Sequence, residues 1–372
     1  MIAPRRDPEI LLRRWWENGA PGPLSVPLAL LSAGYRLGLA ARERAYGWGL
    51  LKTERLPCPV VSVGNITLGG SGKTPTVELA ARSLRALGAS PAVVSRGYGR
   101  QSRGVAVVAD RDGVKLDARV AGDEPVLLAE RLPGVPVVVG ENRFQAGRVA
   151  VERCGATVVL LDDGFQNRTV AKDLEIVVLY GRSPWGNSRL FPRGMLREPL
   201  SALGRADLVL VTNPKDASDV EAVSRVVCRH NSRVPVLAAG FEVMDPMEAR
   251  SGRREALAAL SGRKALAFCG LGSPRGFADT LTASGVRVMD LVEFPDHHWF
   301  EPADLVELAR QAEAAGAEGL VTTEKDWVRL RGLALPPIPL WVLPVRLVLE
   351  AGQEVWLQAL GRILDSSGAR RS

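Results

Sequence analysis

The chain is poor in the residues that build metal clusters, disulfide frameworks and membrane spans. Its 372 residues include four cysteines and three histidines, and no two cysteines form a C-x-x-C pair. Widely spaced cysteines beside apolar segments favour reduced, buried thiols in a cytosolic compartment over disulfides or bound zinc. No stretch reaches the roughly 18 consecutive apolar residues that a spanning helix needs. Aromatic residues make up 5% of the chain, and outside the N-terminus few of them alternate with basic residues, which argues against a surface that stacks nucleic-acid bases.

What is present is the composition of a globular protein. Hydrophobic residues make up 46% of the chain and charged residues 24%, and no part has the composition of a long disordered tract. Lysine and arginine number 48 against 41 acidic residues, which gives a net charge of +7, and the N-terminal end is richly basic. At this length two domains are expected.

The most informative segment runs from Pro59 to Leu79 and reads PVVSVGNITLGGSGKTPTVEL. Its apolar, β-branched start predicts a buried strand and its end has helical spacing, so a glycine-rich turn joins a strand to a helix. In such a turn backbone N–H groups surround phosphate oxygens, the helix N-terminus adds a positive partial charge, and a lysine reaches the outer phosphates. The segment therefore predicts a nucleotide-binding loop made of Thr67, Leu68, Gly69, Gly70, Ser71, Gly72, Lys73 and Thr74.

One position of this loop departs from the strict pattern G-x-x-x-x-G-K-[ST], because Thr67 stands where that pattern has its first glycine. The alternative is a glycine-rich turn before an ordinary amphipathic helix, but the order strand, Gly-Lys-Thr, helix favours a phosphate loop. The Thr74 hydroxyl is then expected to bind Mg²⁺. A second buried strand ends in Asp162 and Asp163, and an acid delivered beside a phosphate loop holds Mg²⁺ or its water shell. An acidic turn after a core strand is the alternative for that pair.

Two loops carry residues that are candidates for contact with a substrate. Arg96, Tyr98 and Arg100 follow a predicted strand, and the ends of strands are where α/β sheets keep their sites. A solvated turn is the alternative. Arg193 and Arg197 lie in the connection LFPRGMLREPLSAL, which is long enough to form the wall of a cleft.

Candidates for proton transfer are fewer and less specific. Asp123 precedes a helical spacing with proline in its first turn, so it is either a catalytic acid or an ordinary N-cap. His297 lies beside an aspartate in the loop VEFPDHHWF, where a histidine suits proton transfer or is merely solvated. The segment Thr323 to Asp326 has the spacing of a capping box.

Taken together, these motifs resemble the tetraacyldisaccharide 4′-kinases, the lipid A 4′-kinase family. They occur in the order of the family and span most of the chain from Ser62 to Asp326. The family shares the missing glycine at Thr67. The matching segments are SVGNITLGGSGKTP (62–75), SRGYGR (95–100), GDEP (122–125), LDDGFQ (161–166), PRGMLREP (192–199), FPDH (294–297) and TEKD (323–326).

The resemblance implies ATP-dependent phosphorylation of the 4′-hydroxyl of tetraacyldisaccharide 1-phosphate, which gives lipid IVA, at the cytoplasmic face of the bacterial inner membrane. It implies ATP and Mg²⁺ as cofactors. Asp123 and His297 would form a dyad that activates the sugar hydroxyl, with Lys73 as the third catalytic residue. The chain departs from the family at Asn167, where histidine is common, so the role of that histidine is open here, although asparagine can keep a hydrogen bond. With Asn167, the five basic and aromatic loop residues named above are the expected substrate-binding set.

The N-terminal segment combines aromatic residues from Trp15 onward with apolar residues and with Arg36, Arg42 and Arg44. This composition is typical of an interfacial helix, whose aromatics lie at headgroup level and whose arginines face anionic lipid. We therefore expect peripheral or shallow contact with an anionic membrane surface, as in the family. The alternative is a helix packed on the protein's own core. A cleavable signal peptide is not expected, because the apolar region holds an arginine and no small-residue cleavage site follows it.

Strands that alternate with helices predict a P-loop NTPase-like fold, with a doubly wound, mostly parallel sheet, a second, smaller α/β domain and an N-terminal membrane-facing helix. The expected divisions are residues 1–55 for the N-terminal helical region, 56–240 for the kinase domain, 241–260 for a hairpin linker, and 261–372 for the smaller domain, which closes the active-site cleft.

A different class of protein shares the phosphate loop and the acid pair. A nucleotide-switch or assembly ATPase acts on a protein partner and has no need of the SRGYG, PRGMLREP and DH loops or of a lipid-facing helix. We therefore expect a lipid substrate and a membrane surface as partners, with no nucleic acid and no obligate protein partner.

Overall fold

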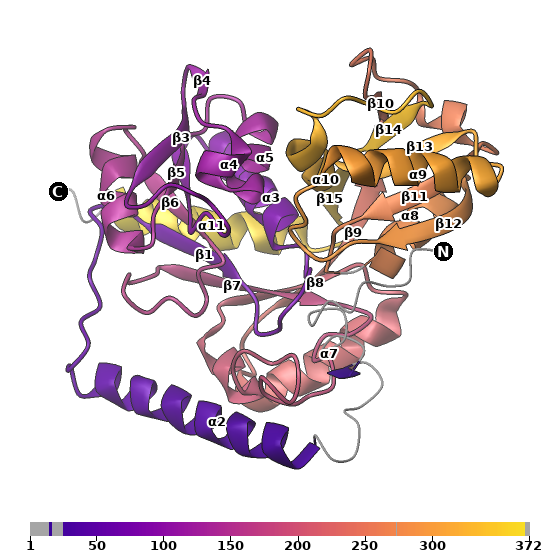
Figure 1. The fold of residues 1–372 in the computed structure, drawn as a ribbon. Coiled ribbons are helices and arrows are strands. Elements are labelled where there is room, and N and C mark those ends of the chain that lie inside the picture. The colour runs from indigo at the N-terminus through magenta and orange to yellow at the C-terminus, as the bar shows by residue number, and fades with distance from the viewer. Residues whose placement is uncertain (1–14, 17–24, 273, 369–372) are drawn as a thin grey trace.

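Ten strands form one sheet around the phosphate-loop segment. The computed structural model, which describes residues 15–16, 25–272 and 274–368, orders them β15-β9-β8-β7-β1-β6-β2-β5-β3-β4 (Figure 1). Neighbours are parallel except at the two ends, where β15 runs antiparallel to β9, and β3 antiparallel to β5 and β4. The bounds are β1 (Val60–Gly64), β2 (Pro91–Ser95), β3 (Ala106–Asp110), β4 (Gly113–Val114), β5 (Val137–Val139), β6 (Val158–Asp162), β7 (Leu174–Tyr180), β8 (Leu208–Thr212), β9 (Val236–Val243) and β15 (Val345–Leu349).

Helices cover both faces of this sheet, because its central strands are apolar on both sides. Strands β1, β6 and β8 are buried along their whole length, as parallel strands between two layers of helices must be. Val61 packs with α3 (Lys73–Ala86), α5 (Asp123–Arg131) and α11 (Gln353–Gly368), whereas its neighbour Val60 packs with α6 (Arg143–Glu152) on the other face. Helix α7 (Ala217–His230) covers the same face as α6 further along. The predicted doubly wound, mostly parallel sheet is confirmed.

A second sheet of five strands forms the smaller domain, in the order β10-β14-β13-β11-β12. All its neighbours are parallel except β10 and β14. The apolar faces of α9 and α8 close its two cores through Leu305 and Leu308 and through Phe277 and Leu281. The bounds are β10 (Met247–Glu248), β11 (Lys264–Cys269), β12 (Arg287–Glu293), β13 (Gly319–Thr323), β14 (Leu340–Leu343), α8 (Pro274–Ala283), α9 (Pro302–Ala314) and α10 (Glu324–Leu330).

The end of the chain does not stay in the smaller domain, contrary to the expected division at 261–372. After β14 the chain crosses back, β15 pairs with β9, and α11 packs against α3 (Figure 1). Trp356 of α11 is fully buried there and donates its indole N–H to Ser83 over 3.0 Å. The expected hairpin linker is also shorter than 241–260, since β9 extends to Val243 and β10 already belongs to the second sheet. The two connections between the domains, one after β9 and one between β14 and β15, lie side by side, and Met244 N of the first donates to Pro344 O of the second over 2.9 Å.

Helix α2 (Ser25–Gly47) runs along the first domain without joining either core (Figure 1). None of its residues is buried. Polar contacts tie it to the body, among them Tyr35 to the carbonyl of Arg197 over 2.8 Å and Ser32 to the carbonyl of Leu190 over 3.0 Å. Four of its apolar side chains, Val26, Leu30, Leu31 and Leu37, are exposed, with Leu37 at 72%. Residues 1–14 and 17–24 of the expected N-terminal region lie outside the described residues, and no helix in the described part of the chain is long and apolar enough to cross a membrane.

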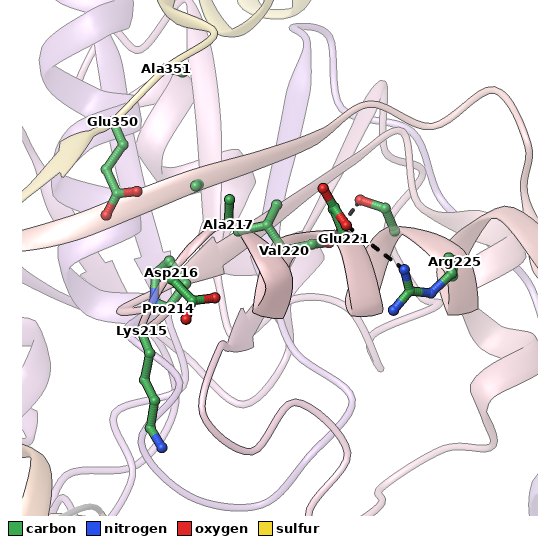
Figure 2. Close-up of a pocket in the computed structure, with 11 residues that line it drawn as sticks. Pro214, Lys215, Asp216, Ala217, Val220, Glu221, Arg225, Glu350 and Ala351 are labelled. Atoms are coloured by element: carbon green, nitrogen blue, oxygen red, sulfur yellow. Dashed lines mark hydrogen bonds and ion pairs between the residues drawn. The ribbon is translucent and has the colours of Figure 1, made fainter.

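A shallow groove of about 600 Å³ lies along the N-terminal half of α7, but it holds none of the predicted site residues. The charged side chains of Glu221 and Arg225 pair with each other on its helical wall, 3.9 Å apart (Figure 2). It is lined by Pro214, Lys215, Asp216, Ala217, Val220, Glu221, Ser224, Arg225, Ala238, Glu350 and Ala351.

Candidate active site

The phosphate loop lies between β1 and α3, as the sequence predicts. Gly72, the N-cap residue of α3, has a left-handed backbone (φ 85°), and no side chain caps the helix. The first N–H groups of α3 are therefore available to a phosphate. Asn65 Nδ2 donates to Ser71 Oγ over 2.9 Å, and Thr212 Oγ1 donates to the Ser71 carbonyl over 2.8 Å. These bonds hold the turn against β1 and β8.

Thr212 and Phe241 pack against the phosphate loop, although the phosphate-loop pattern in the sequence does not point to them. A Cβ atom added to Gly72 would lie 3.2 Å from Thr212 and 3.3 Å from Phe241. Both side chains come from strands β8 and β9, which are distant from the loop in sequence. Glycine is therefore required at position 72 for two reasons: its backbone is left-handed, and these two side chains leave no room for a Cβ atom.

Thr67, in the place of the missing glycine, forms an antiparallel β-bridge with Leu196. Beside it, Leu68 N donates to the carbonyl of Met195 over 2.7 Å. A bridge of extended backbone does not need the conformational freedom of glycine. The PRGMLREP segment thus holds the first two residues of the phosphate loop, Thr67 and Leu68, although the two segments are separate motifs in the sequence.

The two acids after β6 have different partners. Asp162 is buried and accepts a hydrogen bond from Ser95 Oγ over 2.9 Å. Asp163 has a left-handed backbone (φ 50°) and receives Arg197 Nη1 at 2.9 and 2.8 Å from its two oxygens. Lys73 Nζ lies 3.8 Å from Asp163. The predicted acid pair and the lysine of the phosphate loop are therefore close together.

The environments of these two acids move their pKa values apart. Burial raises the pKa of Asp162 to about 7, and the negative charges of Glu124 and Asp163 act in the same direction. Burial also acts to raise the pKa of Asp163, but the positive charges of Lys73 and Arg197 outweigh it, so this pKa lies below its ordinary value.

Asp123 and His297 lie in contact although they come from different domains. His297, in the loop after β12, has a left-handed backbone (φ 60°), and its Nδ1 lies 3.1 and 3.0 Å from the two oxygens of Asp123. The ring of Tyr98 lies 5.1 Å from the ring of His297. Asp123 is the first residue of α5, whose N-cap is Gly122, so the interpretation of Asp123 as the N-cap is wrong.

Hydrogen bonding and charge keep this carboxylate ionised. Burial alone would raise the pKa of Asp123, but the hydrogen bond with His297 and the positive charge of Lys325 hold it well below its usual range. Burial alone would lower the pKa of His297, but the hydrogen bond to Asp123 and the negative charges of Asp123 and Asp296 together outweigh it, so this pKa lies above its ordinary value.

Lys325 of α10 is a site residue to which the sequence assigned no role. Its Nζ lies 3.0 Å from Glu124, 3.1 Å from Asp296 and 3.4 Å from His297 Nε2. Burial would lower the pKa of Lys325, but the two acids outweigh it and raise it, so the amine stays charged. The expected cap is present as well, since the Thr323 side chain accepts from Asp326 N. The capping pattern explained this segment locally, and only the TEKD match pointed to a further role.

The smaller domain also reaches the phosphate loop and α5. Gly272 packs so closely on the loop that a Cβ atom there would lie 2.4 Å from Gly70 N. Helices α5 and α10 face each other across the two domains (Figure 1), and Arg131 pairs there with Glu324. Both halves of the chain therefore contribute to one site.

Two of the predicted substrate-binding residues are engaged by other groups of the protein. Arg100 donates to Glu141 over 2.7 Å and to Ser102 over 3.3 Å, and its side chain is 3% exposed. Asn167 Oδ1 accepts from Thr169 N over 3.2 Å and from Thr169 Oγ1 over 3.0 Å. The asparagine that replaces the family's histidine therefore forms a local turn.

The other four predicted substrate-binding residues are distributed around the site. Tyr98 is 67% exposed beside His297, and Arg96 is exposed in the same loop. Arg197 pairs with Asp163, and Arg193, four residues earlier, is half-buried.

Comparison with known proteins agrees with the motifs. The profile of the family described as tetraacyldisaccharide-1-P 4′-kinase matches residues 24–363. The chain belongs to this family. Membership confirms the predicted kinase class and gives no support to the nucleotide-switch or assembly ATPase.

Relatives from several bacteria cover most of the chain. The tetraacyldisaccharide 4′-kinase of Syntrophus aciditrophicus is 41% identical over 340 residues, which is 87% of this chain and 91% of the relative. That of Anaeromyxobacter sp. strain Fw109-5 is 45% identical over 328 residues, covering 86% and 87%. The crystal structure of LpxK from Aquifex aeolicus in complex with ATP matches with a TM-score of 0.71 and 31% identity, covering 91% of this chain and 99% of that one. The fold of this kinase family is therefore shared over nearly the whole chain.

Proposed function

We propose that this chain transfers the γ-phosphoryl group of ATP to the 4′-hydroxyl of tetraacyldisaccharide 1-phosphate, with Asp123 as the base. The 4′-oxygen forms a bond to the γ-phosphorus, the bond between that phosphorus and the β–γ bridging oxygen breaks, ADP leaves, and the hydroxyl proton passes to Asp123. The observation that carries the proposal is the contact of 3.0 Å between Asp123 and His297 in a chain that belongs to this kinase family.

The dyad suits a sugar hydroxyl, which is a weak nucleophile. His297 Nδ1–H donates to the Asp123 carboxylate and fixes its orientation, and Lys325 beside Nε2 favours that tautomer. A carboxylate of low pKa is a weak base, so it accepts the proton late, when the new bond to phosphorus has already acidified the hydroxyl. Catalysis in this reaction rests mainly on position and charge.

The phosphate side would be held by the loop. Lys73 reaches the outer phosphates, and the N–H groups at the start of α3 bind their oxygens. The lysine lies 3.8 Å from Asp163, which keeps it at the mouth of the loop.

Mg²⁺ fits the donors present at this edge. Thr74, Asp162 and Asp163 offer oxygen ligands, and the negative charge crowded around the buried Asp162 would be neutralised by a divalent cation. Among the described residues no three His, Cys, Asp or Glu side chains converge on one point, which agrees with an ion that keeps waters and substrate phosphates as ligands. When bound, Mg²⁺ neutralises charge on the phosphate oxygens.

The acceptor would approach from the side of α2. This helix exposes Leu30, Leu37 and, just beyond its end, Trp48 at 70%, 72% and 73%, and it carries basic residues beside them. Such a face suits the cytoplasmic surface of an anionic inner membrane, where the helix would lie peripherally or insert shallowly. The basic and aromatic loop residues of the predicted set, Arg96, Tyr98, Arg193 and Arg197, would contact the disaccharide.

The direct test is transfer of labelled γ-phosphate from ATP to tetraacyldisaccharide 1-phosphate in detergent micelles. The expected result is a labelled lipid that carries one additional phosphate at the 4′ position. The control omits the lipid and measures released phosphate. The ATPase alternative would be favoured if phosphate were released at the same rate with and without lipid and no labelled lipid formed.

A further inference from the structure

Arg329 is a fully buried arginine in α10, one turn after Lys325. Its Nη2 pairs with Asp326 and donates to the carbonyl of Gly270 over 3.2 Å. The N–H of Gly270 donates to Asp326 Oδ1 over 3.0 Å. The pair of Arg329 and Asp326 therefore fixes Gly270 through both of its backbone groups.

Two nitrogen atoms of the Arg329 guanidinium group do not donate a hydrogen bond to the described residues. Its Nε and Nη1 have no hydrogen-bond acceptor among the described residues. Buried polar groups are normally hydrogen-bonded, so two unpaired donors on one buried side chain need an explanation. Asp123 Oδ2 lies 3.6 Å from Nε, slightly beyond hydrogen-bond distance. Catalytic hydrogen bonds are often long before the substrate is bound, and a small movement would complete this one.

Gly270 connects this arginine to the phosphate side. Two residues further on, Gly272 packs against Gly70 of the phosphate loop, where a Cβ atom would lie 2.4 Å from the Gly70 nitrogen. One buried side chain thus contacts the carboxylate of the dyad and also the backbone segment that covers the phosphate loop.

A purely structural role would be to neutralise Asp326 in the core. That acid already accepts from the N–H of Gly270 and from the hydroxyl of Thr323 over 2.6 Å. Neutralisation of Asp326 does not account for the placement of Nε beside Asp123. The positive charge of Arg329 also contributes to the lowered pKa of Asp123.

We propose that Arg329 is a positioning residue that holds the Asp123 carboxylate in the dyad and couples its placement to the Gly270–Gly272 segment over the phosphate loop. The proposal rests on the base role proposed above for Asp123. It predicts that the loss of Arg329 slows the phosphoryl transfer step without weakening ATP binding.

The test uses the full-length chain with the variants Arg329→Met/Asp326→Asn and Arg329→Lys, measured for kcat, ATP Kd and Tm. The double variant removes both charges together, so no buried charge is left uncompensated, and asparagine still offers an oxygen to Gly270 N. The matched control is Arg331→Met, the same substitution two residues away, which removes a partly exposed pair between the C-cap residue of α10 and Glu130 of α5.

The expected result for the double variant is a kcat about 10- to 100-fold lower, the usual cost of losing a group that orients another, with ATP Kd and Tm near those of the parent. The kcat of Arg329→Lys should lie between those of the parent and the double variant. Lysine keeps the charge, but its single ammonium group cannot donate to Gly270 and Asp123 at the same time as the branched guanidinium can. Arg331→Met should keep its kcat. A folded double variant, or a lysine variant, with the parent's kcat would overturn the proposal.

A second arm combines Arg329→Lys with Asp123→Asn. If Arg329 acts through Asp123, this combination is no slower than Asp123→Asn alone. Losses that multiply would assign Arg329 a separate structural role and overturn the proposal. A fast Asp123→Asn variant would refute the base itself, and with it this coupling. A slow Asp123→Asn beside a fast Arg329→Lys would refute the coupling alone.

Discussion

Replacing Asp123 by asparagine and His297 by alanine, singly and together, tests whether the two residues act as one catalytic unit. Asparagine keeps the size of the side chain and an oxygen for Glu124 N, which donates to Asp123 over 2.9 Å. It removes the negative charge and the basicity. Lys325 keeps two other acids within 3.1 Å, so the variant is expected to fold.

The magnitude follows from the shared contact. Nδ1 of His297 lies within 3.1 Å of both oxygens of Asp123, so either substitution breaks the same interaction. A positioned base contributes about 10²- to 10⁴-fold in rate, or roughly 3 to 5 kcal/mol of transition-state stabilisation. Independent residues would lose about 10⁴- to 10⁸-fold together, whereas a dyad should lose little more than its poorer single variant.

The assay is phosphoryl transfer to the lipid in micelles, with ATP affinity and Tm measured on the same preparations. ATP affinity should barely change, because among the described residues no hydrogen bond or ion pair joins either side chain to the phosphate loop. A stable Asp123→Asn enzyme with the parent's kcat would refute the dyad. So would single losses that multiply in the double variant.

Three further outcomes are expected. Lys73→Ala and Thr74→Ala should each abolish turnover in the same assay by removing phosphate and Mg²⁺ contacts; near-normal turnover of either would contradict the loop assignment. A chain that begins after Leu51 should stay folded and bind ATP, because α2 buries no residue, yet it should float poorly with anionic liposomes; equal flotation would contradict a membrane role for the helix. Gly272→Ala should lower kcat and ATP affinity, because its Cβ would lie 2.4 Å from Gly70 N; unchanged kinetics would show that the loop tolerates displacement there.

The first domain could be predicted from the sequence because its signals are local. The strand before the phosphate loop, the glycine turn and α3 are contiguous, and each has its own periodicity or turn residue. The return of β15 and α11 to the first sheet could not be predicted this way. An apolar alternation at Val345–Leu349 identifies a strand, but nothing in it says which sheet it joins.

The residues of the candidate site also fall into those that local sequence signals predict and those that they do not. Lys73 and the acid pair could be placed together because strand ends in a doubly wound sheet meet at one edge. Asp123 and His297 are 174 residues apart, and in the sequence only the resemblance to a family links them. Their contact depends on how two domains meet, which periodicity does not encode.

The contact between the domains explains why the sequence of α10 does not reveal its role. The signals of a helix start at Thr323 are real, and they are satisfied within four residues. The partners that give the helix its chemical role are on α5 and in the loop after β12, so Lys325 and Arg329 look like ordinary charged residues of an amphipathic helix. Their pairs with Glu124 and Asp123 join α10 to α5 across the two domains. The Asp123 carboxylate of one domain thereby lies among an imidazole, an ammonium and a guanidinium of the other, so its surroundings depend on the contact between the two domains.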